Sequence, residues 1–297
     1  MAQTQTTLLH LDGRVTDLAG GLQVRRLLPA AVRRAVGPFI FFDHMGPADI
    51  PAETDSDVGG HPHIGLATVT YLYEGSLMHR DSLGSVQEIT PGAVNWMTAG
   101  SGIVHSERTP EALRGRSRRL HGLQLWLALP PELETTAPAF QHVAAEEIPQ
   151  LVPADGVTVR VLAGTALGAT SPVRTASPTV YLDVRLAPGA AWTLPPLAEE
   201  LAIYAPTADC RLDDVALPAR QMAVLPAGSG ARLRAGTTET RLAVIGGAPL
   251  ARPVRMWWNF VATDRARIAA AAKAWAAGGF DPIPGETDRI AAPPWVD

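Results

Sequence analysis

The sequence has little of several residue types that usually identify a class of protein. Cys210 is the only cysteine among 297 residues, and no run of about 18 apolar residues occurs. The single cysteine excludes an intramolecular disulfide and fits a reducing compartment. Without an apolar run, or a basic amino-terminal segment followed by an apolar stretch, no membrane span or secretion signal is predicted. We therefore expect a soluble, cytoplasmic protein that does not contact membranes.

An excess of positive charge is also missing. The formal net charge is −4, the sequence pI is about 6.1, and Lys273 is the only lysine. A protein that grips nucleic-acid phosphates usually carries a strong basic field, so we expect no direct nucleic-acid binding. One local basic cluster, Arg114 to Arg119, is better interpreted as a solvated loop.

What the chain does contain is a long series of short strand signals. Segments rich in Val, Thr, Tyr and Leu, such as Thr68 to Tyr73, alternate with turn clusters such as Glu74-Gly75-Ser76 and Thr90-Pro91-Gly92. This rhythm is typical of antiparallel β-sandwiches and barrels. The sequence therefore predicts an all-β fold.

Chain length and a weak internal repeat both predict two domains. Pro91-Gly92 leads towards Gly100-Ser101-Gly102 in the first half, and Leu225-Pro226 leads into Gly228-Ser229-Gly230 in the second. All eight histidines lie at or before position 142, which assigns metal chemistry to the first half. We expect domains at 1–145 and 146–297, with the boundary in the polar stretch 146–154.

Only one stretch reads clearly as a helix. Ala266 to Ala277 are strong helix formers, Gly278 can end the helix, and Thr263 is a plausible N-cap with Asp264 in the first turn. The sequence predicts a carboxy-terminal helix over 264–277. The prolines that follow predict an extended tail.

Two pairs of potential metal ligands are the most informative feature. His61 and His63 are two residues apart, as are His105 and Glu107. Residues two apart on a strand point to one face of the sheet, so each pair could direct both side chains at one ion. Three imidazoles and a carboxylate suit iron, manganese, nickel, copper or zinc and can leave positions open for substrate or oxygen. The alternative is that these residues decorate solvated strands, but the flanking residues favour buried strands.

The residues around these pairs resemble those of the pirin family. The resemblance rests on Gly60-His61-Pro62-His63, the run from Asn95-Trp96-Met97 through Gly100-Ser101-Gly102 to His105-Ser106-Glu107, and His121 to Trp126. It extends over most of the chain. It implies two cupin (jelly-roll) β-barrel domains in one chain, a bicupin.

The resemblance also implies a metal site and two roles. It implies that His61, His63, His105 and Glu107 bind Fe(II), with other divalent transition metals as alternatives, and that the second barrel is degenerate and holds no metal. In one role the protein cleaves quercetin or a related flavonol with dioxygen, as some pirins do. In the other it is a non-enzymatic, metal-dependent, redox-sensing regulator with a protein partner, either a transcription factor or a metabolic enzyme.

Chemistry gives Glu107 a second task. Many cupins carry a glutamate shortly after the second histidine, whereas Ala67 and Thr68 occupy that region here. Glu107 is then the only acidic candidate in the ligand set, and we expect it to act as catalytic base as well as ligand. Asp43 is a second candidate base, although its position before Gly46-Pro47 favours a structural turn.

The remaining histidines receive structural interpretations. We expect His79 at a surface strand position and His121 in a structural hydrogen bond rather than a metal bond. His10, His44 and His142 have no potential ligand at strand spacing. Trp257, Trp258 and Phe260 are expected to pack the last segment of the chain against the barrels.

Overall fold

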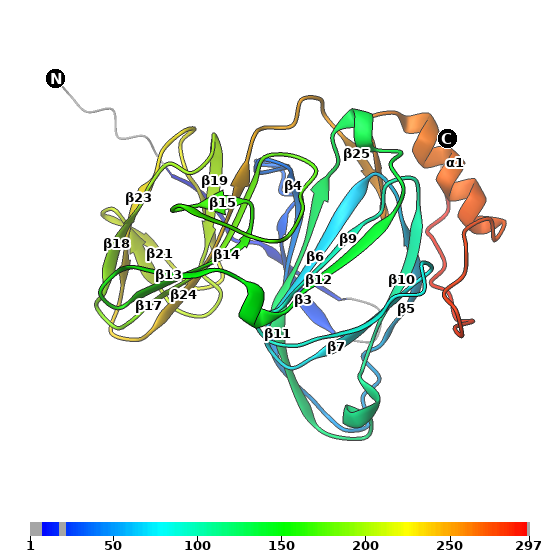
Figure 1. Cartoon of the computed structure of the whole chain (residues 1–297), viewed down its shortest axis with the longest axis horizontal. Helices are drawn as coiled ribbons and strands as arrows, with labels where there is room; N and C mark the ends of the chain where they lie inside the picture. Colours follow the sequence, from blue (N-terminus) through cyan, green and yellow to red (C-terminus); the bar gives the residue numbers. More distant parts are fainter. Residues whose placement is uncertain (1–7, 18–21, 296–297) are drawn as a thin grey trace. The chain divides into compact units, whose positions relative to one another are not determined.

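The computed structural model describes residues 8–17 and 22–295 and is mostly β-structure (Figure 1). The chain forms two compact units, each of which is assembled from three separate segments of the sequence. The histidine unit contains residues 15–24, 43–145 and 250–297. The second unit contains residues 1–14, 25–42 and 146–249.

Two sheets make up most of the histidine unit, although residues 25–28 and 39–42 of the larger sheet are assigned to the second unit. The larger has the order β12-β9-β6-β11-β4-β3-β2, and the smaller has the order β5-β10-β7-β8. The larger sheet consists of β12 (Ala139–Val143), β9 (Val94–Thr98), β6 (Leu66–Glu74), β11 (Arg118–Ala128), β4 (Phe39–Ile50), β3 (Gln23–Leu28) and β2 (Arg14–Asp17). The smaller consists of β5 (Val58–His63), β10 (Ile103–Arg108), β7 (Leu77–Asp81) and β8 (Val86–Ile89), antiparallel throughout.

The second unit repeats this plan. Its larger sheet has the order β1-β22-β19-β24-β17-β14-β13, and its smaller sheet has the order β18-β23-β20-β21. The larger sheet consists of β1 (Leu9–Leu11), β22 (Met222–Val224), β19 (Glu200–Tyr204), β24 (Thr240–Gly247), β17 (Thr179–Leu186), β14 (Val157–Ala163) and β13 (Gln150–Ala154). The smaller consists of β18 (Ala191–Leu194), β23 (Ala231–Ala235), β20 (Cys210–Leu212) and β21 (Val215–Leu217).

Short elements complete the chain. They are the hairpins β15 (Thr165–Ala166) with β16 (Ala169–Thr170) and β25 (Arg255–Trp257) with β26 (Phe260–Ala262), and the 3₁₀ turns Glu111–Leu113, Pro131–Leu133 and Ala145–Glu147. Two sheets per unit confirm the predicted all-β fold.

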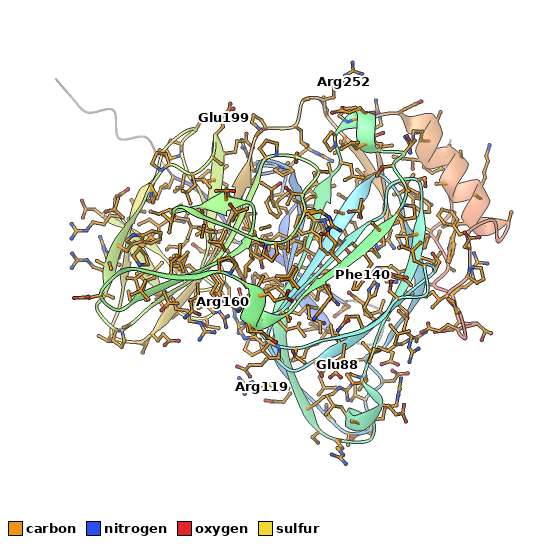
Figure 2. The ribbon with its side chains drawn as sticks, viewed as in Figure 1. Glu88, Arg119, Phe140, Arg160, Glu199 and Arg252 are labelled. Carbon is orange, nitrogen blue, oxygen red and sulfur yellow. The ribbon has the colours of Figure 1, made fainter. Side chains whose placement is uncertain are left out.

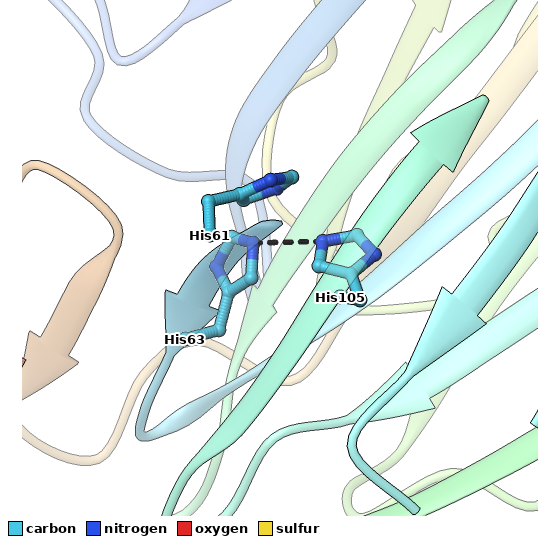
Figure 3. A group of neighbouring side chains, drawn as sticks. All are labelled: His61, His63 and His105. Atoms are coloured by element: carbon cyan, nitrogen blue, oxygen red, sulfur yellow. Dashed lines mark hydrogen bonds between the residues drawn. The ribbon is translucent and has the colours of Figure 1, made fainter. Parts of the chain in front are cut away.

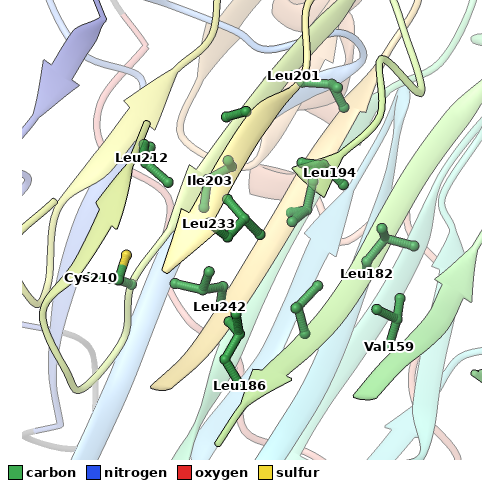
Figure 4. Close-up of a cluster of buried hydrophobic side chains, with 14 of the residues drawn as sticks. Val159, Leu182, Leu186, Leu194, Leu201, Ile203, Cys210, Leu212, Leu233 and Leu242 are labelled. Atoms are coloured by element: carbon green, nitrogen blue, oxygen red, sulfur yellow. The ribbon is translucent and has the colours of Figure 1, made fainter. Parts of the chain in front are cut away.

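An apolar core joins the two sheets of the second unit. It combines Val159, Leu182 and Leu242 of the larger sheet with Leu194, Leu212 and Leu233 of the smaller one (Figure 4). Cys210 belongs to the same cluster, and burial raises the pKa of its thiol to about 12. The cysteine is therefore structural, as the sequence predicts.

The predicted helix is α1 (Arg265–Ala276). Its N-cap is Asp264, whose Oδ1 accepts from the Ala266 backbone N–H at 2.9 Å. The prediction of Thr263 as the cap was wrong, because Thr263 instead directs its backbone N–H and its hydroxyl at the buried carboxylate of Glu134. Phe260, Ile268 and Trp275 form an apolar cluster beneath the helix, which confirms the expected packing of this segment.

In the part of the chain that is described, no helix combines the length and the apolar character needed to cross a membrane.

Candidate metal centre

Three histidines from two neighbouring strands meet in the histidine unit. His61 and His63 lie on β5 and His105 lies on β10, and one ring nitrogen of each falls within 4.8 Å of the other two (Figure 3). All three side chains are buried. His61, His63 and His105 of the two predicted pairs therefore meet, whereas Glu107 is not part of this group.

Strand register explains this convergence. β5 and β10 are antiparallel, with His105 directly opposite His61 and Ile103 opposite His63. Directly opposite residues point to the same face, and so do residues two apart on one strand. The imidazoles of His61, His63 and His105 must then share one side of the smaller sheet.

The spacing of the ring nitrogens fits a single ion. The Nε2 atoms of His63 and His105 are 3.1 Å apart. Two nitrogens bound to one ion at about 2.1 Å with an angle of about 90° between them would be about 3.0 Å apart. His61 Nδ1 lies 2.9 Å from the carbonyl oxygen of Gly59, to which an Nδ1–H would donate. That tautomer leaves the Nε2 lone pair of His61 free for a metal.

Burial keeps these imidazoles neutral, which is the form that binds metals. It lowers the pKa of His61 to about 4, and it lowers the pKa values of His63 and His105 well below the usual value. Protons therefore compete weakly for the site at neutral pH.

Glu107 follows His105 at the two-residue spacing and lies opposite His79 of β7. Burial raises the pKa of its carboxyl to about 7, and its carboxylate has no hydrogen-bond or ion-pair partner among the described residues. It is not part of the group of three histidines. A buried carboxylate without a partner would be stabilised by a cation beside it.

His79 is a neighbour of the site that the sequence interpretation placed wrongly. Instead of lying at the surface, it is buried on β7, with its ring 5.3 Å from that of His105. Its Nε2 is 2.9 Å from Asp81 Oδ2, and its ring stacks on that of Phe140, with 4.2 Å between the ring centroids. Phe140 lies on β12 (Figure 2). The signal was present, because His79 and Asp81 have the same two-residue spacing as the two ligand pairs.

Two other candidate residues, His121 and Asp43, lie within strands of the larger sheet. His121 lies 2.8 Å from His44 between their Nε2 atoms, which confirms a hydrogen bond for His121. Asp43 does not lie in a turn, as was expected, but inside β4 with 2% of its surface exposed. The expected turn was wrong because β4 continues through Gly46-Pro47 to Ile50.

The face of the larger sheet that looks towards the histidines, called the facing wall below, carries polar groups. The Trp126 ring lies 5.1 Å from that of His63, so this face of β11 looks towards the metal centre. Gln124, two residues earlier, is on the same face, and its Oε1 accepts from the Thr70 hydroxyl at 2.7 Å. Asn95 lies opposite Thr70 and contacts His142 Nδ1 at 2.7 Å. This wall offers both an aromatic surface and amide or hydroxyl groups.

The second unit has no equivalent donors. Aligning the smaller sheets by strand order places β18 on β5 and β23 on β10. Leu233 lies opposite Trp192 and Ala231 opposite Leu194, in the same register as the histidine unit. His61, His63, His105 and Glu107 then correspond to Trp192, Leu194, Leu233 and Ala235. Side chains of this kind cannot hold a transition metal.

Comparisons with known proteins agree with this architecture. The family model for pirin matches residues 21–127, and the model for the pirin C-terminal cupin domain matches residues 181–281. A pirin-like protein from Caulobacter vibrioides is 43% identical over 273 residues, covering 91% of this chain and 93% of its own. A Pseudomonas aeruginosa protein provisionally named quercetin 2,3-dioxygenase is 37% identical, covering 97% and 90%.

A solved structure is similar over nearly the whole chain. The crystal structure of quercetin 2,3-dioxygenase from Acinetobacter baumannii has a TM-score of 0.90 and 35% identity, covering 98% of this chain and 96% of that one. Together with the two family models, this match confirms the predicted arrangement of two cupin domains in one chain.

Proposed function

The chain belongs to the pirin family, and from this premise we propose that it is an iron(II)-dependent dioxygenase that cleaves quercetin or a related flavonol. The observation that carries the proposal is the convergence of His61, His63 and His105 on one buried point. Relatives that carry the name quercetin 2,3-dioxygenase support the choice of substrate and of dioxygen.

We propose that His61, His63, His105 and Glu107 hold the metal. Neutral imidazoles and one carboxylate match the donor preference of iron(II) and leave positions for a chelating substrate. When bound, iron would supply Lewis acidity for the flavonol oxygens and a redox centre for dioxygen. The three imidazoles would fix the position of the ion, and the Glu107 carboxylate would lower the net charge of the site.

Glu107 is also proposed as the base that takes the proton of the flavonol hydroxyl. The acidity of that hydroxyl is raised when its oxygen is bound to a cation, and a nearby carboxylate can then accept the proton. Carboxylates are common general bases, and Glu107 lies two residues after His105 on the same strand, on the side of the sheet that carries the histidines.

The facing wall would position the substrate. A flavonol is flat and carries several hydroxyl groups, so it needs an apolar surface and a few hydrogen-bonding partners. Trp126 and Phe140 offer ring faces or edges, and Gln124 and Asn95 offer amide groups. Burial around the histidines would exclude water from the reacting atoms.

Glu107→Gln tests the proposed chemistry, because it keeps size and an oxygen ligand but removes the base and the charge. We expect iron-loaded wild type to consume oxygen with quercetin, and the variant to retain iron while its kcat falls by about 100-fold or more. Oxygen uptake and metal content are measured on the same samples. Wild type that binds flavonols without consuming oxygen would contradict the proposal.

A cytoplasmic location is the remaining part of the proposal. The one cysteine is buried and forms no disulfide, as is usual for proteins of a reducing compartment. Cell fractionation of the expressing organism tests it.

A further inference from the structure

The segment that follows α1 lies against both ligand strands of the histidine unit. After Gly278 the chain turns back, and residues 283–290 run along the smaller sheet beside β5 and β10 (Figure 1). The Ile290 backbone N–H donates to the carbonyl of Gly60 at 2.9 Å, and Arg289 forms a parallel bridge with Gly60. This segment, called the tail strap below, therefore covers the edge strand that carries His61 and His63.

The tail strap also binds the outer face of β10. Ser106 and Arg108 alternate with His105 and Glu107, so they point away from the metal centre. Glu286 Oε1 accepts from the Ser106 hydroxyl at 2.9 Å, and Glu286 Oε2 accepts from the Arg108 guanidinium at 2.6 Å. Glu286 and Arg108 are only 12% and 15% exposed, so the ion pair is well shielded from solvent. Asp288 accepts a further bond from Arg108 at 2.6 Å.

Two glycines before His61 make this close approach feasible. The register between β5 and β10 shifts at this point, since His105 pairs with His61 but Glu107 pairs with Val58. Gly59 and Gly60 therefore form a bulge opposite Ser106. A Cβ on Gly60 would lie 2.9 Å from the Asp288 carbonyl oxygen, and one on Gly59 would lie 2.8 Å from the Asp288 carboxylate. A side chain at Gly60 would therefore displace the backbone of the strap, whereas one at Gly59 would move the carboxylate of Asp288.

The bulge connects the strap to a metal-binding ring. The Gly59 carbonyl is the group that the His61 Nδ1 contacts at 2.9 Å, and this contact sets both the tautomer and the ring orientation. The bond from the Ile290 N–H to the Gly60 carbonyl and the bridge between Arg289 and Gly60 hold the backbone of this bulge in place. Glu286 fixes the same strap to the strand of His105 and Glu107.

We infer that the tail strap is a positioning element of the metal centre: Glu286 and Asp288 fix it to β10, and its Arg289-Ile290 backbone holds the Gly59-Gly60 bulge and thereby aims His61 at the ion. The inference rests on the proposed function only in that the site binds a metal. The tail strap is also bound to α1. The Arg289 guanidinium lies 3.8 Å from the centroid of the Trp275 ring, and Trp275 Nε1 donates to the Ile290 carbonyl at 3.1 Å. The strap is thus held between the last turn of α1 and the ligand strands.

Cobalt(II) titration of the full chain tests this inference, with affinity and the visible d–d spectrum as readouts. Glu286→Ala removes the bonds to Ser106 and Arg108, and we expect about tenfold weaker cobalt binding with a changed spectrum. Glu286→Gln keeps an oxygen acceptor for the Ser106 hydroxyl and should restore part of the affinity.

Glu134→Gln is the matched control. Glu134 is also a buried carboxylate of this unit. Among the described residues its side chain bonds to Thr263 and Arg267 at the start of α1, the opposite end of the helix from Trp275, and not to β5 or β10. We expect this variant to bind cobalt like wild type. An equal loss of cobalt affinity in both variants would mean that Glu286 contributes only to general stability, and it would overturn the inference.

The remaining outcomes separate this inference from the proposed function. Wild-type affinity and spectrum in Glu286→Ala would overturn the role of the strap and leave the metal site intact. Wild type that binds no cobalt would overturn both. If Glu286→Ala does not fold, Ser106→Ala removes a single hydrogen bond and must weaken binding in the same direction, or the inference fails.

Discussion

Asp57, just ahead of β5, illustrates how surroundings set the behaviour of one side chain. Its Oδ1 accepts from the Thr109 backbone N–H at 2.6 Å, and its Oδ2 accepts from Arg114 at 2.8 Å. Burial alone would raise the pKa of the carboxyl, but the bonds from Thr109 and Arg114 outweigh it, so the pKa lies below its usual 3.8. The folded protein therefore favours the ionised form of Asp57.

This shift predicts a pH-dependent loss of stability in Asp57→Asn. A group with a lowered folded pKa contributes stability above its unfolded pKa and loses it as pH falls through the folded value. We expect the variant to lower the free energy of unfolding by about 1–2 kcal/mol at pH 7. The difference from wild type should shrink below pH 3.8.

Urea unfolding over a pH series measures this difference. Asp49→Asn is the control, since Asp49 is 86% exposed and lies 3.8 Å from Arg119. We expect no measurable change in that variant. A deficit of Asp57→Asn that stays constant into acid would refute the assignment.

Sequence reasoning at this scale succeeded where the relevant geometry was local. Two-residue spacing placed His61 and His63 on one face, because strand alternation depends only on neighbouring residues. Their meeting with His105 also required the register between β5 and β10. The burial of His79 depends on Phe140, which comes from a strand about sixty residues later in the chain. The same limitation applies to the bond between Glu286 and Ser106, since nothing near either residue identifies the other.

At the scale of elements, the existence and position of the strands and the helix were predicted better than their exact ends. The segment Thr68 to Tyr73 lies within β6, whose residues Leu66 to Tyr73 are all buried, and the helix expected over 264–277 is Arg265–Ala276. The N-cap was misassigned because Thr263 and Asp264 are both good capping residues. The choice between them was made by Glu134, which lies about 130 residues away and binds Thr263.

The corrected cap leads to a prediction for α1. Asp264→Ala removes the acceptor for the Ala266 N–H and should lower the stability of the histidine unit by about 1 kcal/mol. Asp264→Asn keeps an acceptor and should stay close to wild type. Thermal unfolding of both variants measures the effect, and equal stability of Asp264→Ala and wild type would show that the cap does not contribute.

For the whole molecule, one plan of two sheets is used twice with different interiors. Trp192, Leu194 and Leu233 fill the second unit where the histidine unit carries its three imidazoles. The sequence predicted this contrast because no histidine follows position 142. It did not predict that each unit is assembled from three separate segments, since such exchanges depend on contacts between distant residues. The division into domains at 145 and 146 stays a prediction.

Metal analysis after anaerobic iron(II) loading tests the central claim most directly. Wild type should hold about one ion per chain, and the double variant His61→Ala, His63→Ala should hold almost none while remaining folded, because loss of two ligands leaves too few donors for tight binding. His10→Ala, a histidine of the second unit, is the control and should load like wild type. Full occupancy in the folded double variant would contradict the account.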